Sequence, residues 1–186
     1  MEQLITNQHP ATSDEERLVL KAKQDLREFT ALYLRYVQPV YRYFFSRIGV
    51  QTEAEDATAQ TFLSALEGLE SYQHNGHFAA WLFAIARRKN ADHFRKSGKL
   101  TFLTESIVSG DEDLLQQAIR SDQLAWLTEK IGQLPEEEQE LLRLRFAAEL
   151  QFLDIAKLLN RNEDAVKKSF YRILDRLHKQ MEVSRE

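Results

Sequence analysis

Cysteine is absent from the 186 residues of this chain. Its absence excludes disulfide bonds, thiolate nucleophiles and zinc sites that use cysteine ligands. Disulfides are rare in reducing compartments, so the composition is compatible with a protein of the cytosol.

Long apolar runs are also absent from the sequence. No segment approaches the roughly 20 apolar residues that a membrane helix needs. The N-terminal stretch contains Asp14, Glu15 and Glu16 and lacks the basic and apolar layout of a signal peptide. We therefore expect a cytoplasmic protein that does not insert into a membrane.

Glycine and proline are scarce, with six and three residues respectively. No segment alternates apolar and polar residues as a half-buried strand would, whereas long segments repeat apolar residues at helical spacing. The sequence therefore predicts an all-α fold. Two small helical domains, each with its own core, suit a chain of this length.

Signatures of catalysis are missing too, because the sequence has no phosphate-binding glycine loop and no nucleophile beside a recognisable base. His74 and His77 lack partner ligands at metal-binding spacing. We expect no enzymatic activity, no cofactor and no metal. The net charge of -4 argues weakly against a nucleic-acid binder, but affinity for phosphate depends on local clusters of lysine and arginine.

Three helices are predicted in the N-terminal half. The first follows an apolar stripe over residues 26–48, and Pro39 should kink or split it. The second opens at TEAE with Thr52 as its capping side chain. Its predicted buried residues are Ala59, Phe62, Leu63, Leu66 and Leu69. The third covers residues 78–97, FAAWLFAIARRKNADHFRKS.

The third helix combines an apolar face with a basic one. The residues that share its apolar face are Phe78, Leu82, Ile85 and Ala86. Trp81 lies beside Arg88 and Arg95 on an adjacent stripe, a pairing with which single-strand binders stack a base and hold its phosphate. A core tryptophan beside solvated arginines explains the same pattern, so both interpretations stay open.

Apolar periodicity weakens between Leu100 and about Ser121, where acids gather in GDEDLL, and we predict a linker with a short helix near its end. A clear helix start follows at LPEEEQELLRLRF, with Pro135 predicted at the first helical position. The predicted organisation is an N-terminal extension over 1–24, a first domain over 25–99, an acidic linker over 100–123 and a second domain over 124–186.

A helix-turn-helix is predicted within the second domain, over residues 152–177. Asn160 tolerates the left-handed backbone conformation of the turn, and Asn162 can cap the second helix. The outer face of that helix carries Asp164, Ala165, Lys168, Tyr171, Arg172 and Arg176, with Lys167 near its rim. Such a face suits the DNA major groove, although an ordinary solvated helix surface carries similar charges.

These segments together resemble the bacterial RNA polymerase sigma factors of the extracytoplasmic-function (ECF) class over roughly residues 25 to 180. In the N-terminal half the resemblance rests on AEDATAQTFLSAL and on FAAWLFAIARRKNADHFR, with its F-x-x-W-L and I-A-R-x-x-x-x-D-x-x-R patterns. In the C-terminal half it rests on LPEEEQELLRLRFAAELQFLDIAKLLNRNEDAVKKSFYRILDRL. It implies two helical domains that bind the RNA polymerase core and promoter DNA, help to open the DNA and do no covalent chemistry. An anti-sigma factor is implied as a further partner.

The resemblance assigns roles to three groups of residues. The polymerase-binding group is Asp56, Gln60 and Phe62, of which Gln60 stands where the family usually has glutamate and Phe62 equally suits the core. The minus-ten DNA-binding group is Asn75, His77, Trp81, Arg87, Arg88, Arg95 and Lys96. The minus-thirty-five DNA-binding group is Asn162, Lys167, Lys168, Tyr171 and Arg172.

Some features depart from the family or allow other interpretations. Three residues of the second domain differ from those usual in the family: Arg161, Ala165 and Ser169. The resemblance therefore does not predict which minus-thirty-five DNA sequence this protein prefers. A helix-turn-helix regulator that acts without polymerase and a helical protein-binding adaptor are the alternative functions. The linker acids Glu105, Asp111, Glu112 and Asp113 could thread a basic polymerase channel, shield a basic face of the free protein, or only keep a tether in solution.

Overall fold

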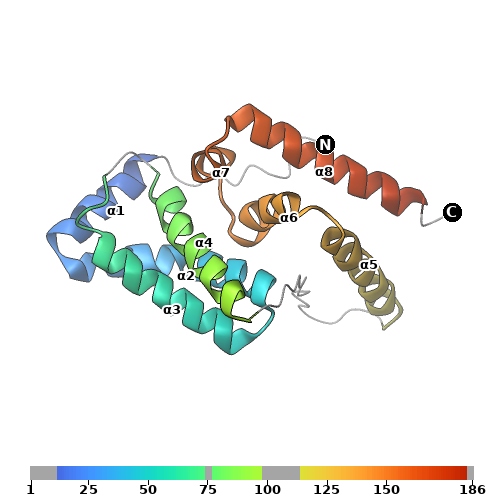
Figure 1. Cartoon of the computed structure of the whole chain (residues 1–186), viewed down its shortest axis with the longest axis horizontal. Helices are drawn as coiled ribbons and strands as arrows, with labels where there is room; N and C mark the ends of the chain where they lie inside the picture. Colours follow the sequence, from blue (N-terminus) through green and yellow to red (C-terminus); the bar gives the residue numbers. More distant parts are fainter. Residues whose placement is uncertain (1–11, 74–76, 98–113, 184–186) are drawn as a thin grey trace.

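The computed structural model describes residues 12–73, 77–97 and 114–183 (Figure 1). The first unit consists of α1 (Thr12–Gln24), the 3₁₀ turn η1 (Leu26–Glu28), α2 (Phe29–Ile48), α3 (Gln51–Gly68) and α4 (Phe78–Ser97). The second unit consists of α5 (Leu114–Gly132), α6 (Glu136–Leu142), the π-helical turn η2 (Arg143–Ala147), α7 (Phe152–Leu159) and α8 (Glu163–Val183). The predicted all-α fold is confirmed. No helix in these three ranges is both long enough and apolar enough to cross a membrane.

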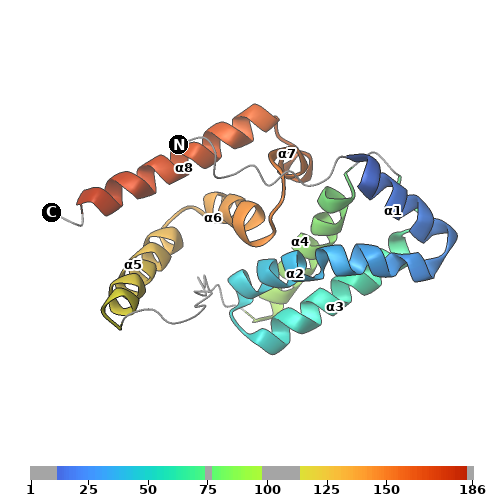
Figure 2. The ribbon, with the colours of Figure 1, turned by 180° about the vertical axis from the view of Figure 1, so that it is seen from behind.

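The first unit encloses an aromatic core between α2, α3 and α4 (Figure 2). Tyr43 and Phe44 of α2 and Phe78 and Phe83 of α4 are completely buried in it. The rings of Tyr43 and Phe83 meet edge to face with their centroids 5.7 Å apart, an arrangement that aromatic quadrupoles favour. This core fixes the orientation of α4 and therefore the direction of its basic face.

Helix α1 lies within the predicted N-terminal extension and packs against α2 and α4. Its buried Glu15 accepts hydrogen bonds from the Tyr36 hydroxyl and, at 3.3 Å, from the backbone N–H of Phe78. Burial, followed by the nearby Glu15 carboxylate, raises the pKa of Tyr36 well above its usual value. Through these bonds α1 holds the N-terminal end of α4.

Pro39 was expected to kink or split the first helix, and it does not split it. Helix α2 runs without interruption over Phe29–Ile48 with Pro39 inside it. Tyr36 and Val40 on either side of the proline are buried. Their burial offsets the backbone hydrogen bond that a proline removes from a helix interior.

The predicted cap of α3 is also wrong. Gly49, with a φ of 75°, ends α2 in the left-handed conformation, and Val50 then precedes the first helical residue, Gln51, without a side-chain cap. Thr52 therefore lies inside the helix. The Gln51 amide donates a hydrogen bond to Glu55 at 2.8 Å, so a side-chain pair replaces the predicted capping box.

The buried face of α3 differs from the predicted one. Ala59 and Leu63 were predicted in the core but are exposed, whereas Thr58 and Thr61 are buried. The two threonine hydroxyls donate to the backbone carbonyls four residues earlier, at 2.7 Å and 2.8 Å. Threonine counts as polar in a periodicity pattern, yet these local bonds satisfy its hydroxyl inside the core.

The second unit begins within the predicted linker, because α5 starts at Leu114. Pro135 is the N-cap of α6, with an extended ψ of 145°, and not its first helical residue as predicted. The side-chain amide of Gln139 closes this connection by donating to the carbonyl oxygens of Gly132 at 3.1 Å and Leu134 at 2.9 Å. These bonds fix the direction in which α6 leaves α5.

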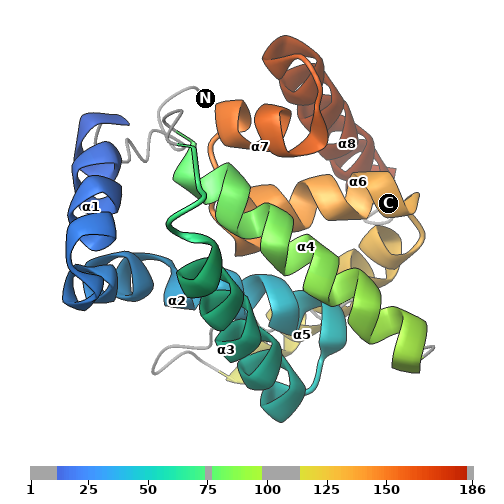
Figure 3. The same ribbon diagram turned by 60° about the vertical axis from the view of Figure 1, so that its left-hand side comes forward.

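The two units pack against each other (Figure 3). Helix α7 lies against α4, and the turn η2 lies against α2. Buried side chains of both units form one continuous hydrophobic cluster. Helix α4 therefore contacts the core of its own unit and the helix-turn-helix of the other.

Candidate nucleic-acid and polymerase interfaces

The helix-turn-helix is built by α7, a tight turn and α8. Asn160 adopts the left-handed conformation, with a φ of 51°, and the backbone N–H of Arg161 donates to Ala156 at 2.8 Å. The side-chain oxygen of Asn162 accepts from the N–H groups of Asp164 at 2.8 Å and Ala165 at 3.4 Å. Both sequence predictions for this turn are confirmed, and they satisfy backbone groups that the helix ends leave open.

The outer face of α8 carries exposed Lys168, Tyr171 and Arg172. Lys167 at its rim pairs with Glu163 at 2.7 Å. The hydrogen bond to Glu163 raises the pKa of the Lys167 ammonium. Asn162 is occupied as the cap of α8 and Lys167 is paired, whereas the other members of the predicted minus-thirty-five group, Lys168, Tyr171 and Arg172, are exposed.

Two residues that depart from the family pattern contact each other. A guanidinium nitrogen of Arg161 in the turn donates to the hydroxyl of Ser169 on α8 at 2.9 Å. The family usually has arginine at position 169, which would bring a second positive charge beside Arg161. Serine at position 169 avoids this repulsion, so the two departures suit each other.

The predicted polymerase-binding residues lie on two faces of α3. Asp56 and Gln60 are exposed, and the Gln60 amide donates to the Asp56 carboxylate at 2.6 Å. Phe62 is only 5% exposed, and its ring meets Tyr33 edge to face at 4.8 Å. Leu63, 61% exposed, lies on the Gln60 side, and sequence reasoning missed it by assigning it to the core.

Trp81 on α4 packs against the core, as one of its two interpretations predicted. Its ring centroid lies 4.7 Å from that of Tyr72 and 5.4 Å from that of Phe78, and a methyl group added at Gly68 would approach the indole to 3.2 Å. The side chain is nevertheless half-buried and not fully enclosed. Arg88, two turns along the same stripe, is exposed.

Several predicted residues lie outside what the structure describes. Asn75 falls in the segment 74–76, and the side chains of Arg95 and Lys96 are not described although the backbone of α4 includes them. The acids predicted to line the linker also fall outside the described residues. The minus-ten group is therefore seen through His77, Trp81, Arg87 and Arg88.

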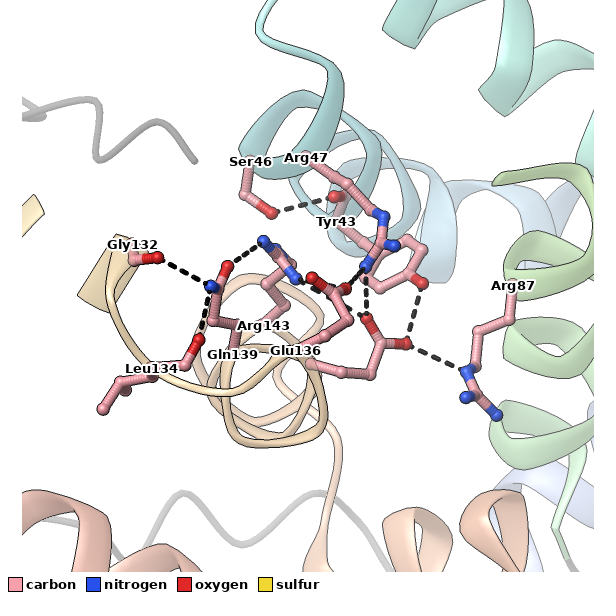
Figure 4. A network of polar contacts seen from close by, with 10 residues as sticks. Tyr43, Ser46, Arg47, Arg87, Gly132, Leu134, Glu136, Gln139 and Arg143 are labelled. Atoms are coloured by element: carbon pink, nitrogen blue, oxygen red, sulfur yellow. Dashed lines mark hydrogen bonds and ion pairs between the residues drawn. The ribbon is translucent and has the colours of Figure 1, made fainter. Parts of the chain in front are cut away.

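Arg87 takes part in a polar network between the units that no sequence pattern had indicated (Figure 4). Glu140 of α6 accepts hydrogen bonds from the Tyr43 hydroxyl at 2.9 Å and from Arg87 at 2.9 Å. Arg47 of α2 donates to the same carboxylate at 3.1 Å and also to Glu136. These partners come from segments so distant in the sequence that no spacing pattern connects them.

Further pairs join the units beside this network. His77 and Asp154 of α7 lie 3.1 Å apart, and Arg42 of α2 pairs with Glu149 at 2.8 Å. In each of these pairs the basic residue belongs to the first unit and the acid to the second. The contact between the units thus consists of polar pairs, of which those made by arginine are pairs of opposite charge, beside a shared apolar core.

Burial shapes the electrostatics of this network. The Tyr43 phenol is completely enclosed, and burial, followed by the Glu140 carboxylate, raises its pKa well above the usual value. Burial is the main cause that lowers the pKa of Arg143, and the charge of the neighbouring Arg47 lowers it further. Arg143 pairs with Glu136 at 3.2 Å. At neutral pH the phenol is protonated and donates its hydrogen bond to Glu140.

Comparison with known proteins identifies the class. Residues 32–100 match the family Sigma-70 region 2, and residues 124–177 match the family Sigma-70, region 4. The chain therefore belongs to the sigma-70 family, with both of these regions. Its relatives, which include ECF factors, place it more narrowly, as an ECF RNA polymerase sigma factor, a protein of transcription initiation and not an enzyme.

Two relatives illustrate the similarity. The ECF RNA polymerase sigma factor BldN of Streptomyces coelicolor is 35% identical over 149 residues, which make up 77% of this chain and 56% of BldN. The chain thus spans little more than half the length of that relative. The RNA polymerase sigma factor YlaC of Bacillus subtilis is 29% identical over 163 residues, 83% of this chain and 92% of YlaC.

A solved structure shares the fold. CnrH, in complex with the cytosolic domain of CnrY, superposes with a TM-score of 0.62 over 90% of this chain and 97% of that chain. The two sequences are 21% identical, so this likeness concerns the arrangement of helices. It agrees with an all-helical protein that ends in a helix-turn-helix.

Proposed function

We propose that this sigma factor directs the polymerase core to promoters through two DNA-binding faces. The exposed outer face of α8, which presents Lys168, Tyr171 and Arg172 on a capped second helix, is the observation that carries the proposal. Lys168 and Arg172 reach base edges in the major groove, and Lys167 contacts phosphate. This is the minus-thirty-five reader.

The basic stripe of α4 is the proposed minus-ten reader. Arg88 is exposed there, and Trp81 stands beside it with one side of its indole supported by Tyr72. A supported aromatic ring next to a cation suits an unstacked base and its phosphate. Asn75, Arg95 and Lys96 extend this group, and we assign His77 to it as a reader of a base edge.

The exposed face of α3 is the proposed docking surface for the polymerase core. Asp56 and Gln60 supply its polar part, and exposed Leu63 supplies an apolar contact that the sequence had placed in the core. Phe62 is buried on the other face of α3, where its ring packs against Tyr33. An anti-sigma factor is the further proposed partner, and the proposed location is the cytoplasm.

Run-off transcription tests the proposal, with purified polymerase core and a pool of promoter-containing fragments. Discrete transcripts should require both core and this protein, and Lys168→Ala with Arg172→Ala should abolish them. Arg88→Ala should keep promoter binding but reduce DNA opening, measured by permanganate reactivity of unpaired thymines. Lys21→Ala, which removes one exposed cation from α1, is the matched control and should behave as the unmodified protein.

Two other results would support the alternative functions. DNA binding by α8 without core-dependent initiation would indicate a regulator that acts without joining polymerase. Association with core without promoter-specific transcripts would indicate an adaptor. Either result would overturn the proposed function.

A further inference from the structure

The carboxylate of Glu140 in the second unit lies where arginines from two helices of the first unit meet. Glu140 is 9% exposed, and it accepts from Arg47 of α2 at 3.1 Å and from Arg87 of α4 at 2.9 Å. Arg47 is also largely buried, at 14% exposure, and pairs with Glu136 as well. Two guanidinium groups that point from separate helices at one anion form the arrangement with which proteins bind phosphate.

The surroundings of this pair favour an extended anion. A groove between the units lies beside the network, and four arginines line it: Arg47, Arg87, Arg88 and Arg161. The acids that line it, Glu136, Glu137 and Glu140, all belong to α6. Arg88 is the exposed residue already proposed to contact promoter DNA. Arg47 and Arg87 therefore continue the basic stripe of α4 toward the end of α2.

The packed arrangement cannot serve both promoter elements at once. Elements centred about 25 base pairs apart are separated by roughly 85 Å of duplex, at 3.4 Å for each base pair. A compact chain of this length has a radius of gyration of only about 16 Å. The two units must separate on a promoter, and separation removes the carboxylates of α6 from Arg47 and Arg87.

We propose that Arg47 and Arg87 together form a binding surface for a backbone phosphate of promoter DNA, which Glu136 and Glu140 occupy when the units are packed together. This rests on the proposed function, because it extends the minus-ten face of α4. Shielding of a basic face was one of three interpretations that the sequence left open for the acids of the linker. In the packed structure the shielding carboxylates belong to α6, and they compete directly with DNA phosphate for the same guanidinium groups.

A single-charge substitution tests this competition in the full-length free protein. Glu140→Gln should tighten binding to a fluorescein-labelled forked promoter fragment at low salt by about fivefold or more, the lower end of typical coupling between two states. Glu129→Gln removes the same charge from an exposed position of α5 that does not line the groove and should change affinity much less. Adding Arg47→Ala to Glu140→Gln should remove the gain.

Separation of the units is measured independently of DNA. The chain has no cysteine, so spin labels attached through Glu67→Cys on α3 and Lys179→Cys on α8 report one defined distance. Both positions are exposed. Glu140→Gln should add a longer component to the distance distribution, and Glu129→Gln should not. Circular dichroism melting checks that each variant is folded.

Each contrary outcome overturns a definite part of the proposal. A longer distance without tighter DNA binding would show that Arg47 and Arg87 do not bind phosphate. An unchanged distance and unchanged affinity would show that Glu140 does not hold the units together. A gain that survives Arg47→Ala would exclude Arg47 from the surface. Failure of the sigma-factor function itself would appear separately, in the transcription assay with polymerase.

Discussion

The Tyr43 side chain joins two parts of the molecule at the scale of one residue. Its ring packs edge to face on Phe83 inside the first unit, and its hydroxyl donates to Glu140 of the second. A buried hydroxyl that keeps its partner adds to stability, whereas a buried carboxylate that loses a donor is costly. Tyr43 therefore couples the core of one unit to the charge of the other.

Alkaline pH should expose this coupling. Because the folded state raises the pKa of Tyr43, the stability that its protonated phenol contributes is complete below the unfolded pKa of about 10 and is lost as pH rises above it. The free energy of unfolding should fall by at most about 1.4 kcal/mol per pH unit through this one group. Tyr43→Phe should abolish that fall. Urea unfolding between pH 8 and 11 measures the slope, with Tyr171→Phe as an exposed control that should follow the unmodified protein. Equal slopes for Tyr43→Phe and the unmodified protein would contradict the coupling.

Asn162 is a second residue whose two roles can be separated. It caps α8 by accepting from Asp164 at 2.8 Å and was also assigned to the minus-thirty-five group. Asn162→Ala should lower the free energy of unfolding by about 1 kcal/mol, whereas Asn162→Asp should keep the cap and place a negative charge beside the DNA. Urea unfolding and duplex binding distinguish the two. Normal stability of Asn162→Ala would show that the cap contributes nothing.

Among the helices, α4 presents three different surfaces. Its apolar face fills the core of the first unit, its stripe with Trp81 and Arg88 faces outward, and α7 packs against it from the other unit. Because a single helix carries all three surfaces, most substitutions in α4 affect more than one function. Only a residue exposed on the stripe reports on nucleic-acid binding alone.

Trp81 and Arg88 should therefore respond differently to alanine substitution. Trp81→Ala should lower the free energy of unfolding by about 2 kcal/mol, because the indole packs on Tyr72 and Phe78. Arg88→Ala should leave stability within about 0.5 kcal/mol of normal and still weaken single-strand binding. Thermal unfolding and fluorescence anisotropy with a minus-ten oligonucleotide test both parts. A stable Trp81→Ala variant would mean that the ring contributes little to the core.

At the scale of the whole molecule, two units share one hydrophobic cluster and a set of charge pairs. The pairs place basic residues of the first unit against acids of the second, in a setting that is partly closed to water. Such pairs contribute chiefly to specificity, since desolvation offsets much of their attraction. The apolar contact supplies most of the stability, but removing one partner such as Glu140 leaves buried guanidinium groups uncompensated and therefore loosens the packing.

Unfolding of the two units should therefore be coupled. The chain has two tryptophans, Trp81 in the first unit and Trp126 in the second, so the variants Trp81→Phe and Trp126→Phe each report on one unit by fluorescence. Their urea midpoints should coincide once each is corrected for its own change in stability. Adding Glu140→Gln should separate them. Distinct midpoints with Glu140 intact would contradict coupling.

Local signals predicted much of this protein, and their failures have physical causes. The turn around Asn160 and Asn162 follows from backbone preferences that act within a few residues. The face of α3 was predicted wrongly because Thr58 and Thr61 hide their polarity in local hydrogen bonds. Arg47 escaped notice because its partner, Glu140, lies in another unit.

The all-α class, the helix-turn-helix and the family could be predicted from the sequence, because each depends on short-range periodicity, caps and motifs. The exposed face of α3, and the position of Glu140 where the arginines of α2 and α4 meet, became known only from the packing of the helices. Those outcomes depend on contacts between segments far apart in the chain. Burial, which sets the strength and protonation of such contacts, exists only after the units have packed.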